Sequence, residues 1–335
     1  MAEKILSIIV PSYNTSSFVQ ECVPTFIDER LFNDVDVFFI DDGATDNTEQ
    51  TLRPFLEKYP DYFHFCHKEN GGHGSVINYG LSKCVKTKYF KVIDGDDFVD
   101  REALINLVSY LKTTNDDLIV SGYLEKYPDG EAKIPPIRMG DNSGYKERTT
   151  YGPELLIALN LTIHSATFKT SIFVDNQIVM PEKLFFEDNL FILYPTIYLK
   201  AISFINDHVY CYRLGNPNQS VSIAGKLKHY QDSLVIRDMA HHFFADKVEG
   251  KCPSSVEDCC IKRIAEGLSC YRDTLLYFKN NKIARDKCHT LYDEDTKFPK
   301  LLKELKKQKF HRYLFASNFR FIGLFRAIEK RNFQK

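Results

Sequence analysis

Short apolar runs recur through the first half of the chain and alternate with helix-like segments. The runs are rich in β-branched and aromatic residues, and polar residues do not alternate within them, which is typical of buried strands. These runs lie at residues 5–10, 35–40, 62–67, 89–94 and 117–122. The helix-like segments lie at about 17–30, 46–58, 74–84 and 100–113, and Pro54 weakens the second of them. This alternation predicts an α/β fold with a mostly parallel sheet and helices on both of its faces.

Polar residues follow three of these runs at the point where each strand is expected to end. They are residues 11–14 (PSYN), 41–43 (DDG) and 94–97 (DGDD). The carboxyl ends of parallel strands meet at one edge of a sheet, where such folds bind their ligands. We therefore expect the three segments to line one crevice.

Asp94, Asp96 and Asp97 place three carboxylates close together after a buried strand. Two carboxylates about 4 Å apart repel each other by about 4 kcal/mol at an effective dielectric constant of 20. A divalent cation between them removes this cost, and oxygen ligands suit Mg²⁺ or Mn²⁺, which usually also bind substrate phosphates. The alternative is a solvated loop with acidic turn residues. The acidic end of a second strand, at residues 41–43, favours a site for a metal and phosphates.

The composition argues against a nucleic-acid-binding, disulfide-bonded, zinc-binding or membrane-spanning protein. A formal net charge of −1 gives no reason to expect a nucleic acid partner. Nine cysteines without a C-x-x-C pair indicate buried thiols in a reducing compartment, and the histidines form no zinc-binding pattern. The first residues lack the pattern of a signal peptide, and no run of about 18 apolar residues occurs. We therefore expect a cytoplasmic protein without a membrane-spanning helix.

The motifs together resemble glycosyltransferase family 2 with its GT-A fold. The residues that carry the resemblance are 8–14 (IIVPSYN), 40–48 (IDDGATDNT), 68–81 (KENGGHGSVINYGL), 92–97 (VIDGDD) and 185–191 (FFEDNLF). The resemblance covers residues 4 to 225 and implies a Rossmann-like, mostly parallel sheet. Members of the family move a sugar from a nucleotide diphosphate to an acceptor, and many act in bacterial polysaccharide assembly.

The resemblance implies that residues 1–225 form the catalytic domain. Its nucleotide-binding half would be residues 1–100, and its acceptor half would be residues 101–225. Residues 226–335 lie outside the resemblance, look helical throughout, and are expected to form a C-terminal helical region.

The resemblance also assigns residues to the nucleotide. Asp42 would accept a hydrogen bond from the pyrimidine base, with Pro11 beside it and Tyr13 stacked near the ring. The alternative for Tyr13 is an aromatic side chain packed at a strand end. Asp41 would have a structural role and bond to nearby backbone.

The acidic cluster would hold Mn²⁺ or Mg²⁺ against the donor diphosphate. Asp96 is the first choice for a metal ligand, with Asp97 as the second. Asp94 would share the cation, the ribose or the donor sugar. A cation across the two phosphates would stabilise the negative charge of the nucleoside diphosphate leaving group.

Glu187 and Asp188 begin an apolar helix pattern, where acidic residues are favoured by free N–H groups and by the helix dipole. A helix cap is therefore one interpretation of Asp188. The resemblance implies the other, in which Asp188 deprotonates the acceptor hydroxyl and Glu187 orients it or the acceptor. A base opposite the leaving group implies a single displacement with inversion at the anomeric carbon.

Two positions depart from the family pattern near the nucleotide. Ile77 stands where the family often has an arginine, and Arg213 is a candidate to replace its contact with the diphosphate. The alternative for Arg213 is a strand-edge residue with a solvated head. Ala44 replaces the usual serine, with little expected effect. His73, in a glycine-rich segment, is expected near the donor.

The C-terminal segment 300–335 is basic and rich in phenylalanine. It has 11 Lys or Arg against two Glu and six of the 26 Phe, a net charge of +9 by this count. This mixture suits a helix that lies on an anionic membrane surface, here the inner face of the cytoplasmic membrane. The alternative is that the phenylalanines pack against the catalytic domain or a second copy of the chain, as in a homodimer.

These observations predict an inverting, metal-dependent glycosyltransferase. Its partners would be a nucleotide-sugar donor, such as a UDP-sugar, and a glycan or lipid-linked acceptor in cell-surface polysaccharide synthesis. The alternatives are a nucleotide-sugar-binding or scaffold protein with weak catalysis and a D-x-D phosphotransferase. The latter usually places its aspartate after the first strand, where this chain has PSYN.

Overall fold

The computed structural model describes residues 3–134, 144–159, 161–215 and 219–333. The chain forms two compact units, residues 1–215 and residues 216–335. The domain boundary predicted from the sequence, after residue 225, lies ten residues later than the boundary between these units. Each unit is described by itself below, as unit 1 and unit 2.

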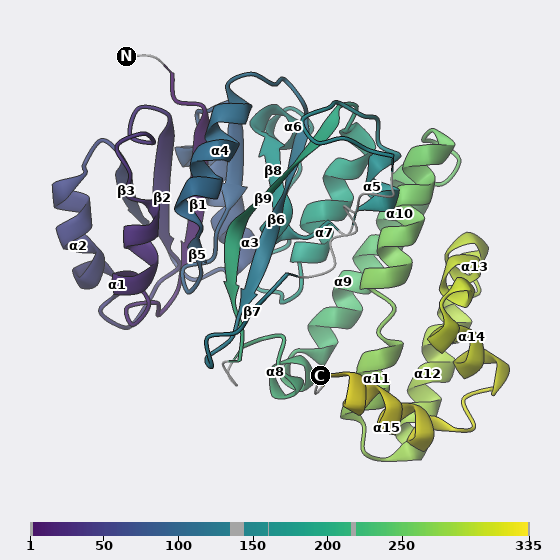
Figure 1. Cartoon of the computed structure of the whole chain (residues 1–335). Coiled ribbons are helices and arrows are strands. Elements are labelled where there is room, and N and C mark those ends of the chain that lie inside the picture. The colour runs from purple at the N-terminus through teal and green to yellow at the C-terminus, as the bar shows by residue number, and fades with distance from the viewer. Residues whose placement is uncertain (1–2, 135–143, 160, 216–218, 334–335) are drawn as a thin grey trace. The chain divides into compact units, whose positions relative to one another are not determined.

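Unit 1 is built on a sheet of nine strands within the described residues (Figure 1). Their order is β3-β2-β1-β4-β8-β6-β9-β5, and β7 pairs with β6. The strands are β1 Leu6–Ser12, β2 Val35–Asp41, β3 Phe63–His67, β4 Tyr89–Val92, β5 Phe98–Val99, β6 Leu118–Lys126, β7 Ala132–Lys133, β8 Ala166–Lys169 and β9 Ile202–Arg213. The five predicted strands are present.

The neighbouring strands β3, β2, β1 and β4 are all parallel, as predicted. The rest of the sheet is mixed, because β8 runs antiparallel to β4 and β6, whereas β9 runs parallel to β6. The parallel register pairs Ser12 with Asp41 and Asp41 with His67. This register brings the polar ends of β1, β2 and β3 to one edge.

The helices of unit 1 are short. They are α1 Val19–Cys22, α2 Thr48–Lys58, α3 His73–Tyr79, α4 Arg101–Leu111, α5 Leu155–Ala158, α6 Thr170–Val174 and α7 Asp188–Leu193, with 3₁₀ turns η1 Val23–Phe26, η3 Ile163–Ser165 and η4 Tyr194–Tyr198 and a π turn η2 Gly80–Cys84. The helix predicted over 17–30 breaks into α1 and η1. Pro24 lies at the start of η1 and has no N–H to continue the α-helical bonding. In contrast, Pro54 is accommodated inside α2.

Helices cover both faces of the sheet because β1 is apolar on both sides. Ile8 belongs to a buried cluster with Leu104 and Leu107 of α4. Its neighbour Ile9 points to the other face, against η2. At Gly80 an added Cβ would lie 2.7 Å from Ile9 Cδ1, so only glycine lets η2 pack this closely.

Unit 2 is helical, as predicted. Its elements are α8 Ile223–Lys228, α9 Tyr230–Phe243, the π turn η5 Phe244–Val248, α10 Ser254–Gly267, α11 Tyr271–Tyr277, α12 Asn281–Asp295, α13 Pro299–Lys307, α14 Lys309–Ala316 and α15 Ile322–Phe333. The predicted breaks at residues 250–254 and at Pro299 separate η5 from α10 and α12 from α13.

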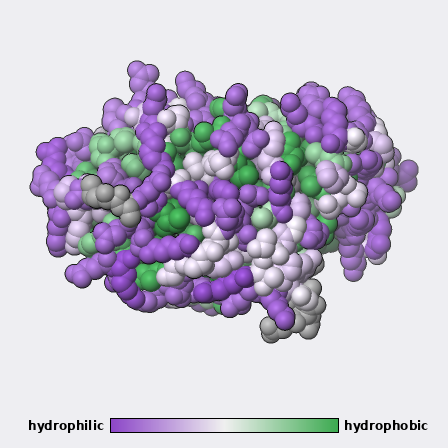
Figure 2. All heavy atoms as spheres, turned by 90° about the horizontal axis from the view of Figure 1, so that it is seen from above, coloured by the Kyte–Doolittle hydropathy of each residue, from purple (hydrophilic) through white to green (hydrophobic). Residues whose placement is uncertain are grey.

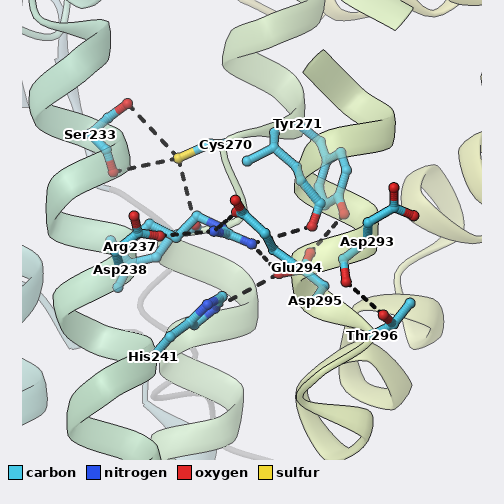
Figure 3. Close-up of polar contacts among 12 residues, drawn as sticks. Ser233, Arg237, Asp238, His241, Cys270, Tyr271, Asp293, Glu294, Asp295 and Thr296 are labelled. Atoms are coloured by element: carbon cyan, nitrogen blue, oxygen red, sulfur yellow. Dashed lines mark hydrogen bonds and ion pairs between the residues drawn. The ribbon is translucent and has the colours of Figure 1, made fainter. Parts of the chain in front are cut away.

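A buried ion-pair network joins three helices of unit 2 (Figure 3). The guanidinium of Arg237, on α9, is 1% exposed and pairs with the carboxylates of Asp295 and Glu294 on α12. The Tyr271 hydroxyl, on α11, donates to Asp295 Oδ2 at 2.7 Å. A buried charge is tolerated when it is paired and hydrogen-bonded in this way.

Most phenylalanines of the C-terminal segment pack inside unit 2. Phe319 is buried, and Phe310, Phe315 and Phe325 pack against the same cluster. Among the side chains of this segment that the structure describes, the exposed large apolar ones are instead Tyr313, Phe321, Leu324 and Ile328. Arg326, which interrupts the apolar pattern in the sequence, turns inward and donates to the carbonyl oxygens of Leu275, Phe278 and Lys279.

In the described part of the chain, each helix is too short or too polar to cross a bilayer. Hydrophilic residues predominate on the face drawn in Figure 2, between smaller hydrophobic areas.

Candidate active site

Asp42, at the end of β2, is held by the connection between β3 and α3. Its buried carboxylate accepts hydrogen bonds from Lys68 Nζ at 2.6 Å and from the backbone N–H groups of Gly71 at 2.9 Å and Gly72 at 2.8 Å. Gly72 has φ +83°, a conformation that favours glycine. Ser75 Oγ also lies 3.5 Å from Oδ1, whereas among the described residues Oδ2 accepts only the bond from Gly72, so Oδ2 retains an acceptor position for a ligand. The sequence did not identify Lys68 as its partner.

The neighbouring Asp41 bonds within the protein, in keeping with a structural role. Its Oδ1 accepts from the backbone N–H of Ala44 at 2.8 Å, and its Oδ2 lies 2.7 Å from His67 Nδ1. These contacts fix the turn after β2. Asp42 instead contacts the connection between β3 and α3.

Pro11 and Tyr13 lie at the end of β1, beside Asp42. Pro11 pairs with Ile40 in the sheet register. The Tyr13 side chain is 51% exposed, so its ring is accessible to a ligand at this edge.

The acidic segment after β4 surrounds the hydroxyl of Tyr210, from β9. This hydroxyl lies 2.6 Å from Asp97 Oδ2 and 3.1 Å from Asp94 Oδ2. The backbone N–H of Arg213 donates to Asp97 Oδ1 at 2.7 Å. Burial, together with the charges of Asp96 and Asp94, raises the pKa of Asp97 well above its usual value. Burial and the nearby Asp94 raise the pKa of Asp96 to about 6.

Asp94, Asp97 and His164 offer ligand atoms that all lie within 4.8 Å of one another. His164, in η3, stacks on the ring of Tyr212 with centroids 4.3 Å apart, and burial lowers its pKa to about 4. A neutral imidazole and two carboxylates form a donor set that suits a divalent cation. The residues therefore fit a metal. Asp96, the ligand expected first, is not in this trio.

His73, the first residue of α3, lies between the two acidic parts of the site. Its Nδ1 is 2.5 Å from Glu187 Oε1, and its Nε2 is 3.0 Å from Asp94 Oδ1. Burial by itself lowers the pKa of His73, but the charges and hydrogen bonds of Glu187 and Asp94 raise it well above its usual value. His73 therefore joins the acidic cluster to the start of α7, and its raised pKa favours the protonated ring.

Glu187 is buried and precedes α7, but its side chain makes no cap hydrogen bond and turns to His73 instead. Asp188 is the first residue of α7 and is half-buried, and its Oδ1 accepts from Asn189 Nδ2 at 3.2 Å. The preceding loop has positive φ at Lys183 and Phe186, 56° and 70°, which few residue types adopt readily. This loop turns the Glu-Asp pair toward the strand ends.

Arg213, at the end of β9, lies against the acidic segment rather than in solvent. Its Nε donates to the backbone oxygen of Asp96 at 2.9 Å, and its Nη2 lies 3.0 Å from Glu21 Oε1. The pairing of β5 with β9 brings Arg213 to this position. Tyr210 and His164 reach the same place through contacts that span many residues in the sequence, which is why sequence patterns did not reveal them.

Comparison with known proteins connects this geometry to a family. The model of glycosyl transferase family 2 matches residues 7–175. An uncharacterized glycosyltransferase of Mycoplasma genitalium is 29% identical over 133 residues, which are 39% of this chain and 45% of that protein. The poly(ribitol-phosphate) beta-glucosyltransferase of Bacillus spizizenii is 25% identical over 228 residues, which are 65% of this chain and 34% of that protein. The matches thus span less than half the length of these two relatives.

Two solved structures share the fold. Residues 1–349 of S. aureus TarS, crystallised with UDP-GlcNAc, match with a TM-score of 0.66 and 18% identity over 98% of this chain and 92% of that one. The mannosyltransferase PcManGT of Pyrobaculum calidifontis, with GDP-Man and Mn²⁺, matches with a TM-score of 0.53 and 13% identity over 98% of this chain and 87% of that one. The likeness confirms the expected GT-A fold with its helical C-terminal region.

Proposed function

Because the chain belongs to glycosyl transferase family 2, we propose that it moves a sugar from a UDP-sugar to a hydroxyl of a glycan or lipid-linked acceptor in cell-surface polysaccharide synthesis. The observation that carries this proposal is the bridge from Asp94 through His73 to Glu187. The bridge joins the strand ends, where a donor would bind, to the start of α7, where an acceptor would be activated.

The donor nucleotide would lie at the ends of β1 and β2. Asp42 would accept a hydrogen bond from the N–H of the base, Tyr13 would cover the ring, and Pro11 would lie beside it. Arg213 would lie near the diphosphate, beside the acidic segment. Structural neighbours support a nucleotide-sugar donor, since TarS was solved with UDP-GlcNAc and PcManGT with GDP-Man.

Asp94, Asp96 and Asp97 would hold Mn²⁺ or Mg²⁺, with His164 as a further ligand. When bound, such a cation neutralises the charge that grows on the leaving phosphate oxygen. Arg213 fixes the backbone of Asp96 and the side chain of Asp97 from one side. Tyr210 orients Asp94 and Asp97 from the other.

Asp188 would act as the base toward the acceptor. Its carboxylate takes the hydroxyl proton while the acceptor oxygen bonds to the anomeric carbon and the bond from that carbon to the diphosphate oxygen breaks. Attack opposite the leaving group inverts the configuration. Glu187, held by His73, would orient the acceptor or Asp188.

The exposed apolar side chains Tyr313, Phe321, Leu324 and Ile328 would attach unit 2 to an anionic membrane surface. The basic residues of segment 300–335 support this location, since a basic residue near anionic lipid contributes about 1 kcal/mol. The protein would then lie peripherally on the cytoplasmic face of the membrane, close to a lipid-linked acceptor. A homodimer through the same side chains is the competing explanation.

Transfer can be tested directly with the full chain. UDP release from a panel of UDP-sugars, measured with Mn²⁺ and with a bacterial polysaccharide or lipid-linked glycan as acceptor, should identify a donor. The anomeric configuration of the product, read by NMR, should be opposite to that of the donor. A retained configuration would exclude direct displacement. If none of the UDP-sugars gave UDP release, the proposal would be contradicted.

A further inference from the structure

Two of the nine cysteines lie in contact in unit 1. The Sγ atoms of Cys66, on β3, and Cys84, at the end of η2, are 3.6 Å apart and form a hydrogen bond. Both side chains are half-buried, so small solutes can reach them. A disulfide has an S–S bond of about 2.05 Å, so the two sulfurs need to approach by only about 1.5 Å.

The contact also changes the acidity of the two thiols. The hydrogen bond with Cys84 lowers the pKa of Cys66 to about 7, despite the opposing effect of burial, and nearby His64 adds to the lowering. The pKa of Cys84 is raised by the same hydrogen bond. A lowered pKa favours the thiolate of Cys66, which is the form that reacts with oxidants.

We propose that Cys66 and Cys84 are a modification site at which a peroxide forms a reversible disulfide within the chain. The Cys66 sulfur attacks the peroxide, which leaves a sulfenic acid and one water molecule when the peroxide is hydrogen peroxide. The Cys84 sulfur then attacks the sulfenic sulfur, the S–S bond forms, and a second water molecule leaves. Two thiols are oxidised by two electrons and one hydrogen peroxide is reduced to two water molecules.

The disulfide would close a loop that contains the partners of Asp42. Between the two cysteines lie Lys68, Gly71 and Gly72, which donate to the Asp42 carboxylate, and His73. The new bond would tie the end of β3 to the end of η2 across the segment that holds these donors. We therefore expect oxidation to weaken binding of UDP, an effect that rests on the proposed function.

Peptide mapping tests the disulfide independently of that function. The full chain is treated with hydrogen peroxide, alkylated, digested without reductant and analysed by mass spectrometry. We expect a linked pair of peptides containing Cys66 and Cys84, reversed by dithiothreitol, in wild type and in the control Cys252→Ser. The linkage should be absent from Cys66→Ser and Cys84→Ser. Sulfinic acid at Cys66, linkage between chains, or an unmodified pair would overturn the proposal.

Calorimetry with UDP and Mn²⁺ tests the effect on the donor site. We expect at least threefold weaker UDP binding after oxidation, recovery with dithiothreitol, and no response in Cys84→Ser. A mapped disulfide with unchanged UDP affinity would overturn the link to the donor site. If the reduced protein fails to bind UDP, the proposed function is wrong, and peptide mapping alone decides the disulfide.

Discussion

His73 lies between two carboxylates, which raise its pKa well above the usual value. Its Nδ1 faces Glu187 and its Nε2 faces Asp94, each at hydrogen-bond distance. If either carboxylate turned away, the half-buried His73 ring would lose one of its two hydrogen bonds. A single residue thus links the acidic cluster to the start of α7.

The role proposed for Asp188 predicts a separation of binding from catalysis. Asp188→Asn should lose about 100-fold or more in kcat, because general base catalysis contributes 10²–10⁴-fold. UDP affinity should stay within about twofold, since the base acts on the acceptor. Glu49→Gln, at an exposed acid in the first turn of α2, is the control. A kcat within tenfold of wild type would show that another residue is the base.

Lys68 should matter for the donor although it reaches the site only through Asp42. Lys68→Met removes a charged hydrogen bond to a buried carboxylate, a contact of about 1.5–3 kcal/mol. We expect UDP affinity to fall by about tenfold or more. Lys83→Met, at an exposed lysine of η2, should leave it unchanged. Equal affinities in the two variants would contradict this arrangement of Asp42.

The sequence identified the residues that follow the predicted strands but missed several of their partners. Asp42 and Asp94 stand at strand ends, where topology alone predicts a ligand site. Lys68 and Tyr210 carry no local pattern that marks them, since their roles come from packing against acids far away in the sequence. His164 was missed for the same reason. It lies in the turn η3, and only the folded chain brings its ring close to Asp94 and Asp97.

Among the elements, the parallel strands β1 to β4 were predicted to within a few residues, because each is a buried apolar run. The pairing of β8, β6 and β9 was not predicted. This pairing depends on which strand edges of the sheet are free to form hydrogen bonds beside β4. The hydrophobic periodicity of a strand does not indicate which neighbour it pairs with. The helix predicted over 17–30 was too long. The prediction overlooked Pro24, which ends the α-helix because it has no N–H to donate.

The network of Arg237 predicts how α9, α11 and α12 depend on one another. Arg237→Met leaves the carboxylate of Asp295 buried without its main partner, which should destabilise unit 2 by about 3–5 kcal/mol. Hydrogen exchange of the α12 amides in the full chain measures this loss. Unchanged protection in α12 would mean that the ion pair does not hold the helices together.

A triple variant provides the matched control for this prediction. Arg237→Met, Asp295→Leu and Tyr271→Phe together remove the buried charges, and the neighbouring His241 stays neutral because burial lowers its pKa to about 3. Replacing a buried ion pair with apolar residues is often neutral. We therefore expect protection of α12 to return toward that of the wild type. A triple variant less stable than Arg237→Met would contradict this explanation.

At the scale of the whole molecule, the family model covers part of unit 1, and unit 2 requires a role of its own. Most of its phenylalanines form a core, so the basic segment is a folded part of unit 2 rather than a detached amphipathic helix. Membrane contact would therefore involve a few exposed side chains. The membrane-contacting surface would thus be smaller than the whole segment 300–335 that the sequence pattern indicated.

Sedimentation with anionic liposomes tests this surface. The full chain should sediment with phosphatidylglycerol vesicles at low salt and less at high salt, because the attraction is screened. Phe321→Ser/Leu324→Ser should reduce sedimentation severalfold. Val235→Ser/Ile283→Ser, at exposed apolar residues of α9 and α12, should not. If wild type stays in the supernatant and forms dimers that Phe321→Ser/Leu324→Ser breaks, the surface binds a second copy.

The central claim is a metal-dependent nucleotide site at the ends of β1, β2 and β4. Titration of the full chain with UDP, in the calorimeter, with Mn²⁺ and then with excess EDTA, tests it most directly. We predict binding at one site per chain with Mn²⁺, much weaker binding in EDTA, and loss of the Mn²⁺ effect in Asp96→Asn. Equal UDP affinity with Mn²⁺ and with EDTA, or no UDP binding in either, would contradict the account.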